Sequence, residues 1–425
     1  MSEIALTFVF FATSLLLVWR QRIDLFLVAY LSNLIYGWQT LSGKIWVPPY
    51  EFEVTDNSEL ILTIVFLSIA LFSILNDLIF SRWFNVRDIE LNNSIGSKSS
   101  RTDYQKLLAY FLSTISLLLS ILLILQAGTD LAFLDKTTLN AQYPLSSSFF
   151  LSVPAGIACV YGAYKKEKAL IFLGLFPIIL YVVIGFRSIA IVLIVAVLLI
   201  YSYQTRIVSR KSIRIAGVTA LIFISFVAYK QAYIPIKEGK FDFFQTTVSE
   251  DYRFESTLEF LLWASFSSEF GQVSSNLELS TRNDLSAYHS YSAVFLSSIP
   301  LLSPTEVGVS TNPRFSDTII EHANPGFSYG LGGTFWGENF VLGGFLGVII
   351  ASISFGFTVL LLHYLIFKKG LFILLYLATN LVFLLPKMDI YAVLGVFKNG
   401  IVLIALPMFL IILLLGLRKV AYSKA

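Results

Sequence analysis

The chain has 425 residues, of which 56% are hydrophobic and 13% are charged, and its formal net charge is +3. Soluble domains average about 45–50% apolar and about 25% charged residues, so this composition excludes an ordinary soluble protein and predicts one that spans a membrane. The single cysteine, Cys159, excludes an intramolecular disulfide and a cysteine-based metal site.

Apolar segments that approach the length of a spanning helix, about 20 residues, recur along the chain. The predicted spans are residues 4–19, 23–41, 59–80, 107–126, 147–163, 169–185, 188–204, 215–232, 339–366, 370–386 and 397–416. The first begins without a basic region or a cleavage site, so we expect a retained helix and not a signal peptide. The sequence therefore predicts an all-α polytopic membrane protein with about 11 transmembrane helices.

The distribution of positive charge orients these spans. If the N-terminus lies outside, every inner loop carries Lys or Arg, from Arg20 and Arg22 after the first span to Arg418 and Lys419 after the last. Because Lys and Arg are enriched in cytoplasmic loops, we expect the N-terminus outside and the C-terminus inside. The chain then divides into an N-terminal bundle of about eight helices (1–232), a large outer loop (233–338) and about three C-terminal helices (339–425).

The large outer loop is acidic and partly helical in this prediction. Between residues 234 and 338 it holds 13 acidic and five basic residues. Ser256 and Glu259 form a capping-box pattern, and the apolar residues that follow at four-residue spacing predict a helix over 256–270 at the membrane surface or on the bundle. The segment Tyr291–Leu302 is apolar but too short to span, which indicates a re-entrant or interfacial element.

Arginine is the side chain best suited to an anionic ligand at the outer face. Arg187 lies in "GFRS" between two apolar runs, where an isolated charge is costly. Its planar guanidinium fits two phosphate oxygens at once, although it can also snorkel to headgroups or pair with a loop carboxylate. Arg253, Arg282 and Arg314 in the outer loop are further candidates, with ordinary ion pairs as the alternative for each.

Other titratable residues of the outer loops are weaker candidates for chemistry. A histidine side chain titrates near neutrality and can serve as a general base, so His322 is a candidate, with a solvated loop histidine as the alternative. Glu51 and Glu53 form an acidic pair in the first outer loop, for which a solvated loop is the favoured interpretation. No metal-ligand spacing occurs in the sequence, and we expect no metal and no cofactor.

A glycine-rich stretch, "GFSYGLGGTFWGENFVLGGFLG" (Gly326–Gly347), leads from the outer loop into the ninth predicted span. Glycine permits unusual backbone conformations and close approach to a ligand. The glycines in which we expect loop flexibility or close packing are Gly330, Gly332, Gly333 and Gly337.

The same stretch holds an aromatic residue and a carboxylate. We expect Trp336 in the aromatic belt at the membrane boundary, and Gly343 and Gly347 in close helix packing. Glu338 is predicted at the outer end of the ninth span. It is either stabilised there by the helix dipole or positioned for function at the mouth of a cavity, as a base or as the partner of an arginine.

These features together resemble the Wzy-type oligosaccharide repeat-unit polymerases, which include the O-antigen polymerases and are GT-C-like membrane glycosyltransferases. The resemblance rests on the plan of about a dozen helices with one large periplasmic loop, on "GFR" (Gly185–Arg187) at the outer end of a mid-chain helix, and on the spacing of Gly333, Gly337, Glu338, Phe340 and Gly347. It covers nearly the whole chain, but the motifs are short, and the "HN" element of the related O-antigen ligases is absent.

The resemblance implies an enzyme of the bacterial inner membrane whose active face is periplasmic. It implies inverting, metal-independent glycosyl transfer from a glycan on undecaprenyl pyrophosphate to a second lipid-linked repeat unit. The partners that it implies are membrane lipid, a chain-length regulator and a flippase. Arg187, Arg253, Arg282 and Arg314 would hold the pyrophosphate, with Glu338 or His322 at the acceptor hydroxyl. An O-antigen ligase and a lipid-linked oligosaccharide flippase are the alternatives, and no nucleic acid is expected.

Overall fold

The structure is a computed structural model. It describes residues 2–20, 22–47, 50–81, 104–133, 136–147, 149–186, 188–205, 217, 270–282, 290–292, 294, 315, 319, 334–411 and 413.

Long apolar helices make up most of the described chain, as the hydrophobic runs predict. The N-terminal part contains α1 (Ser2–Arg20), α2 (Leu25–Leu41), α3 (Asp56–Ser81), α5 (Tyr104–Ala127), α8 (Phe149–Lys165), α9 (Lys168–Ile184) and α10 (Ser188–Thr205). The C-terminal part contains α17 (Phe335–His363), α18 (Leu375–Leu384) and α19 (Ile390–Gly400), with single turns η3 (Tyr364–Lys368), η4 (Phe372–Leu374), η5 (Leu385–Lys387) and η6 (Ile401–Ala405). A helix therefore lies at ten of the eleven predicted positions, and residues 215–232 lie outside the described residues apart from Gly217.

Five helices in the described part of the chain are long and apolar enough to cross a membrane. They cover Ser2–Arg20, Asp56–Ile79, Tyr104–Ala127, Phe335–Lys368 and Ile390–Ile411. Three shorter apolar helices cover Lys168–Ile184, Ser188–Tyr203 and Phe372–Lys387. The predicted all-α class is thus confirmed for the described residues, and their apolar helices fit a membrane protein, while the count of 11 spans and their inside–outside orientation remain expectations.

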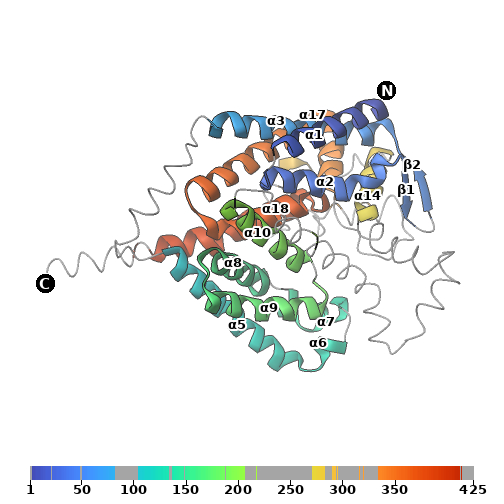
Figure 1. The fold of residues 1–425 in the computed structure, drawn as a ribbon. Helices are drawn as coiled ribbons and strands as arrows, with labels where there is room; N and C mark the ends of the chain where they lie inside the picture. The colour runs from blue at the N-terminus through green and yellow to red at the C-terminus, as the bar shows by residue number, and fades with distance from the viewer. Residues whose placement is uncertain are drawn as a thin grey trace.

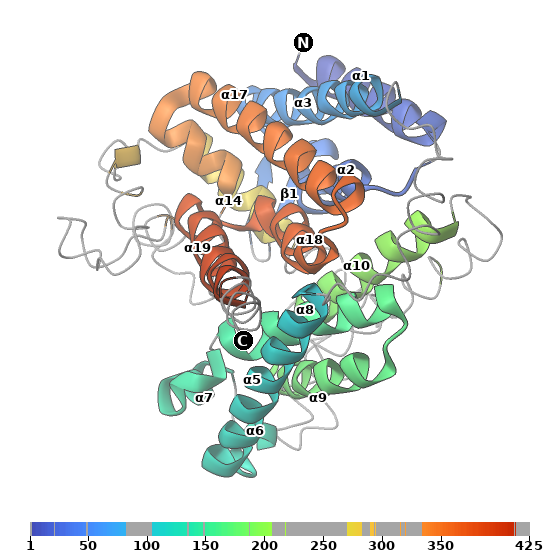
Figure 2. The same ribbon diagram turned by 90° about the vertical axis from the view of Figure 1, so that its left-hand side faces the viewer.

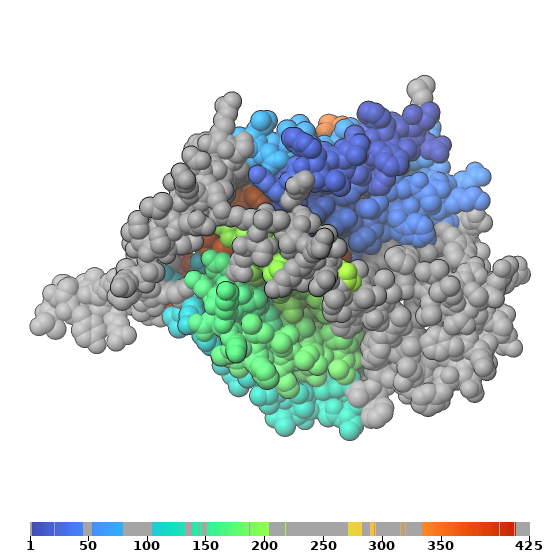
Figure 3. Space-filling model, in the orientation of Figure 1, coloured from blue at the N-terminus to red at the C-terminus, as the bar shows by residue number. Residues whose placement is uncertain are grey.

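The helices form two groups around a central helix (Figure 1). The first group contains α1, α2, α3, α17 and the short helix α14 (Phe270–Arg282), and the second contains α5, α8, α9 and α10. Helix α18 lies between the groups and contacts α2 on one side and α8 and α10 on the other. The space-filling view shows the same division, with α1–α3 in blue above the green residues of α8–α10 (Figure 3).

Charged residues of α1, α2 and α3 gather at one end of the first group. Arg20 lies 2.7 Å from Asp24 and 2.6 Å from Asp77, and its side chain is almost fully buried. His363, near the end of α17, packs on Phe26 at the same end. An unpaired buried arginine would be costly, so these two carboxylates explain why Arg20 is tolerated inside the bundle.

The same pattern recurs in the second group of helices. Lys106 at the start of α5 lies 2.5 Å from Glu167, the residue just before α9. The Gln105 side chain donates to the carbonyl of Gly370. Arg20, Lys106 and Lys368 all belong to the loops that the charge distribution assigns to the cytoplasm. Two ion-pair clusters, Arg20 with Asp24 and Asp77, and Lys106 with Glu167, thus join helix ends that the sequence predicts on the cytoplasmic face.

Two elements between the spans differ from the sequence-based expectation. The segment predicted as the first outer loop contains two strands, β1 (Lys44–Val47) and β2 (Tyr50–Glu53), paired antiparallel with Lys44 opposite Glu53. The connection after α5 contains the short helices α6 (Asp130–Phe133), α7 (Lys136–Gln142) and η1 (Pro144–Ser147). Their polar composition and short length hid them from a search for apolar runs.

Candidate functional site

The glycine-rich stretch forms a helical hairpin and not a simple helix entry. In one straight helix, Trp336 and Phe355 would lie about 28 Å apart along the axis, but their ring centroids lie 5.9 Å apart. Gly344 makes the reversal with φ 58° and ψ −153°, in a region that side-chain-bearing residues resist. The first two turns of α17 therefore fold back against the long part of the same helix, which begins after Gly344 (Figure 2).

Close backbone contact holds the two legs of α17 together. A Cβ atom on Gly347 would lie 2.3 Å from the carbonyl oxygen of Asn339, so only glycine fits there. Phe340 and Phe345 pack edge to face on either side of the reversal, with centroids 5.1 Å apart. The close packing predicted for Gly347 is present, but its partner is the folded-back leg of its own helix.

The short leg of α17 is buried, which corrects the predicted place of Trp336. Trp336 is 2% exposed and donates its indole N–H to the Asn33 side chain of α2 at 2.8 Å. It therefore lies inside the bundle and not in an aromatic belt at the membrane boundary. Gly337 packs on Ser280 of α14, where a Cβ atom would lie 2.6 Å from the hydroxyl oxygen. Its role is close packing, and its backbone is helical.

Glu338 is fully buried at the N-terminus of another helix. One carboxylate oxygen accepts the backbone N–H of Ile390, the first residue of α19. Asp389, the N-cap of the same helix, accepts the N–H of Ala392 at 2.7 Å. The dipole of α19 favours negative charge at this end. Glu338 therefore holds the turn between α18 and α19 (residues 385–389) against the short leg of α17. Of the two roles that the sequence left open, this contact matches stabilisation by a helix dipole, here the dipole of α19.

Tyr291 joins this cluster from the outer-loop sequence. Its hydroxyl donates to Asn339, 3.1 Å from the side-chain oxygen and 3.3 Å from the carbonyl oxygen. Partial burial and, secondarily, the nearby Glu338 carboxylate raise the pKa of the Tyr291 phenol above its ordinary value. The sequence offered only a weak signal for this residue, since it marks the start of an apolar segment too short to span.

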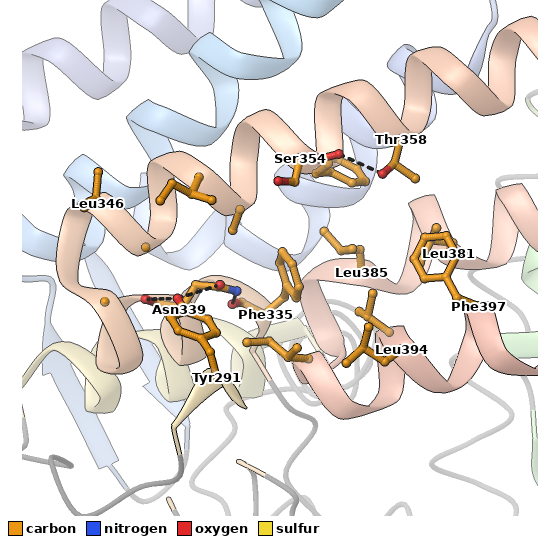
Figure 4. A pocket seen from close by; sticks show the side chains of 17 residues that line it. Tyr291, Phe335, Asn339, Leu346, Ser354, Thr358, Leu381, Leu385, Leu394 and Phe397 are labelled. Atoms are coloured by element: carbon orange, nitrogen blue, oxygen red, sulfur yellow. Dashed lines mark hydrogen bonds between the residues drawn. The ribbon is translucent and has the colours of Figure 1, made fainter. Parts of the chain in front are cut away.

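A cavity of about 490 Å³ opens beside this polar cluster. Tyr291 and Asn339 lie at one end of it, and Thr358 and Phe397 lie at the other (Figure 4). Between them its walls are mainly apolar side chains of α17, α18 and α19, such as Ala351, Leu381 and Val393. The Thr358 hydroxyl is already bonded to the Ser354 carbonyl of its own helix, so the space is most polar at the end with Tyr291 and Asn339 and is lined mainly by apolar side chains elsewhere.

A second buried carboxylate anchors the outer-loop helix α14 on the bundle. Glu278 is fully buried and accepts from the backbone N–H of Thr55, from its hydroxyl and from the Ser58 hydroxyl, at the start of α3. Arg282 donates to the Glu278 carboxylate at 2.5 Å and to the carbonyl of Glu53. These bonds attach a polar helix that apolar packing alone would not hold, because most of its buried residues are polar.

The predicted ligand residues are only partly within the described chain. Arg282 is described, and its guanidinium is already bonded to Glu278 and Glu53, so a pyrophosphate role would require it to share or leave these partners. Glu53 is exposed, as a solvated loop carboxylate would be. The predicted site residues outside the described chain are Arg187, Arg253, Arg314, His322, Gly330, Gly332 and Gly333, and most of the predicted helix 256–270 is outside it too.

The described residues hold no cluster of metal ligands, and no known protein matches the chain. Among the described residues, no group of three or more His, Cys, Asp and Glu side chains could hold a metal ion. The chain matches no protein-family model, no curated protein and no solved structure.

Proposed function

We propose that the protein polymerises oligosaccharide repeat units carried on undecaprenyl pyrophosphate, at the outer face of a bacterial inner membrane. The observation that carries the proposal furthest is the amphiphilic cavity. Its polar end at Tyr291 and Asn339 continues directly into an apolar space between helices of spanning length. Such a space suits a substrate that joins a polar head to a long hydrocarbon tail, and the resemblance to Wzy-type polymerases supplies the chemistry.

The reaction is a glycosyl transfer between two lipid-linked glycans. The acceptor hydroxyl attacks the anomeric carbon of the donor sugar, the bond from that carbon to the pyrophosphate oxygen breaks, and undecaprenyl pyrophosphate leaves with the electron pair. Arg187 stabilises the negative charge that develops on the leaving pyrophosphate, with Arg253 and Arg314 as additional cations. The proton of the acceptor hydroxyl passes to a general base.

The geometry around Glu338 favours a positioning role over that of the base. Its carboxylate is fully buried and already accepts the N–H of Ile390. A base needs hydrogen-bond reach to the acceptor hydroxyl, and Glu338 is not among the described residues that line the cavity. In this proposal His322 is the candidate base, and Glu338 fixes the wall of the cavity.

Deletion of the gene in its native host tests the proposal. We expect the surface glycan to carry a single repeat unit in place of a ladder, with restoration of the ladder by a plasmid copy. A surface without any repeat unit, together with accumulated polymer on the lipid carrier, would indicate the ligase alternative. Loss of surface glycan with lipid-linked single units retained on the cytoplasmic face would indicate the flippase.

A further inference from the structure

Two lysine-rich turns meet where the second group of helices packs against the C-terminal part of the chain. One turn, "YKKEK" over residues 164–168, joins α8 to α9. The other, "FKKG" over residues 367–370, follows α17. Both belong to loops that the charge distribution assigns to the cytoplasm. Because they are far apart in the sequence, only the fold brings them together.

Aromatic stacking joins the two turns. The Tyr164 ring of the first turn stacks on Phe372, just after the second turn, with ring centroids 3.8 Å apart. Tyr203 of α10 also packs on Phe372, with centroids 5.4 Å apart, and its hydroxyl donates to the carbonyl of Phe367. Phe372 is 2% exposed, so the stack belongs to the core and fixes the two turns against each other.

The start of α5 bonds to both turns. The Gln105 side chain donates to the carbonyl of Gly370 and accepts the backbone N–H of Ile373. The next residue, Lys106, forms its ion pair with Glu167 of the first turn, at 2.5 Å. Three segments that are distant in the sequence therefore form one surface, which we call the lysine junction.

The lysine junction, residues 104–106, 164–168 and 367–370, carries an excess of positive charge. Its one carboxylate is Glu167, and its six lysines are Lys106, Lys165, Lys166, Lys168, Lys368 and Lys369. Lys165 and Lys369 are exposed, and each ammonium group also lies over a tyrosine ring, at 5.4 Å and 5.6 Å from the centroid. This concentration of cations fits a ligand that carries several negative charges, such as phosphates.

The surface next to the lysine junction is apolar, which favours a lipid over a soluble anion. Leu107 follows Lys106 on α5 and is 45% exposed, and Phe172 lies one turn after Lys168 on α9 and is 80% exposed. Helix α5 is long and apolar enough to cross a membrane, and α9 is a shorter apolar helix. A soluble anion makes no use of these side chains, whereas the acyl chains of a phospholipid lie beside them while its phosphate meets the lysines.

We propose that the lysine junction binds the headgroup of an anionic phospholipid in the cytoplasmic leaflet. Ammonium groups from both turns surround the phosphates, and the acyl chains run along the exposed apolar side chains of α5 and α9. Basic pockets between spanning helices at this face bind such headgroups, cardiolipin among them. The inference is independent of the proposed function, because it does not depend on the reaction that the protein catalyses. A bound lipid would join the second helix group to the end of α17.

Native mass spectrometry of the full-length protein in detergent tests the site. Cardiolipin, whose headgroup holds two phosphates, and dioleoylphosphatidylcholine, which has no net charge, are titrated separately, and the lipid-bound fraction is measured. Each lysine near the phosphates contributes about fivefold in affinity, so we expect cardiolipin to bind about tenfold to a hundredfold more tightly. Equal affinities of the two lipids would overturn the inference.

Paired substitutions, one in each turn, locate the site. Lys165→Gln combined with Lys369→Gln removes one exposed cation from each turn and should weaken cardiolipin binding about tenfold to thirtyfold. Lys165→Arg combined with Lys369→Arg keeps both charges and should bind as the native protein does. Lys44→Gln, the matched control, removes an exposed lysine from β1 and should change nothing.

Three outcomes of this series would contradict the lysine junction as the site. They are unchanged binding in the glutamine pair, an equal loss in the arginine pair, and an equal loss in Lys44→Gln. Thermal unfolding checks that each variant is folded. If the glutamine pair does not fold, the arginine pair and the comparison of the two lipids on the native protein still decide.

A competition experiment separates a membrane ligand from a soluble one. Inorganic tripolyphosphate carries several negative charges but no acyl chain, so it cannot use the apolar surface of α5 and α9. At the same concentration as the lipid, it should leave cardiolipin bound, whereas dioleoylphosphatidylglycerol, a second anionic phospholipid, should displace it. Displacement by tripolyphosphate, or none by the second phospholipid, would overturn an anionic phospholipid as the ligand of the lysine junction.

Discussion

At the scale of single residues, the buried carboxylates have an effect that is mainly structural. Glu278 meets the first residues of α3, and Glu338 meets the first residue of α19. Each acid comes from the sequence between the two bundles of predicted spans and stabilises the N-terminus of a long helix by charge and hydrogen bonding. An acid in apolar surroundings is therefore no direct indication of catalysis, and its partners decide its role.

The first prediction concerns Glu338→Gln. The amide keeps an oxygen for the Ile390 N–H but loses the charge, so we expect a loss of about 1–2 kcal/mol in stability. Glu338→Ala leaves that N–H without its partner and should cost about 1–3 kcal/mol. Thermal unfolding in detergent measures both. Per folded molecule, Glu338→Gln should form a near-normal ladder. A polymerisation rate lower by about 10²–10⁴-fold, with unchanged stability, would instead identify Glu338 as the general base.

A second prediction concerns Arg187, the arginine that the sequence places between two spans. Arg187→Ala should abolish polymer while the protein remains inserted in the membrane, because no other cation sits at that helix junction in the sequence. Arg187→Lys should rescue poorly, since a lysine cannot reproduce the two-pronged contact with phosphate. A normal ladder from the Ala variant, at equal expression, would remove Arg187 from the proposed site.

At the scale of elements, the reversal at Gly344 positions the polar end of the cavity. It brings Asn339 beside Gly347 and places Glu338 at the start of α19. Gly344→Ala adds a Cβ atom that meets nothing within 4 Å, so any cost comes from the backbone conformation alone, φ 58° and ψ −153°, which is almost restricted to glycine. We expect a loss of about 1–3 kcal/mol in stability.

Two other glycines serve as references for that measurement. Gly395, inside α19, has open space around it and ordinary helical backbone, so Gly395→Ala should stabilise the protein by about 0.5–1 kcal/mol. Gly347→Ala would place its Cβ atom against the Asn339 carbonyl and should be the most damaging of the three. Thermal unfolding measures the change in stability of the three variants and so gives their order. Equal changes for Gly344→Ala and Gly395→Ala would contradict the hairpin in α17.

The sequence predicts the long helices well and the short leg of α17 poorly. Apolar runs identify α1, α3 and α5 because a bilayer requires about 20 such residues in each span. Hydropathy cannot reveal the reversal at Gly344, since both legs are apolar and the glycines of "LGGFLG" also suit straight helix packing. The polar helix α14 was missed for the opposite reason, because its serines, Asn276 and Glu278 read as loop.

The candidate site is only partly predictable, because its members come together from distant parts of the chain. Glu338 and the importance of Gly347 were visible in the sequence, but their partners Ile390 and Asn339 were not. Tyr291 lies 48 residues before Asn339, and periodicity gives no information on such contacts.

At the scale of the whole molecule, the arrangement of helix ends yields a prediction of topology. Cysteines introduced at exposed positions in a Cys159→Ala background are tested with a membrane-impermeant maleimide on spheroplasts. Ser290→Cys should react, because the outer loop carries it, and Lys166→Cys should react only after permeabilisation. Reaction at Lys166 in intact spheroplasts, or protection of Ser290, would reverse the assigned faces and place the polar end of the cavity on the cytoplasmic side.

The most direct test of the central claim is polymerisation by the purified protein. The protein is reconstituted into liposomes with a single undecaprenyl-pyrophosphate-linked repeat unit from its native host, and the products are separated by size. The account predicts a ladder of lipid-linked glycans with steps of one repeat unit, which the Arg187→Ala variant does not form. Repeat units that remain single at every protein concentration, in protein shown to be folded and inserted, would contradict the account.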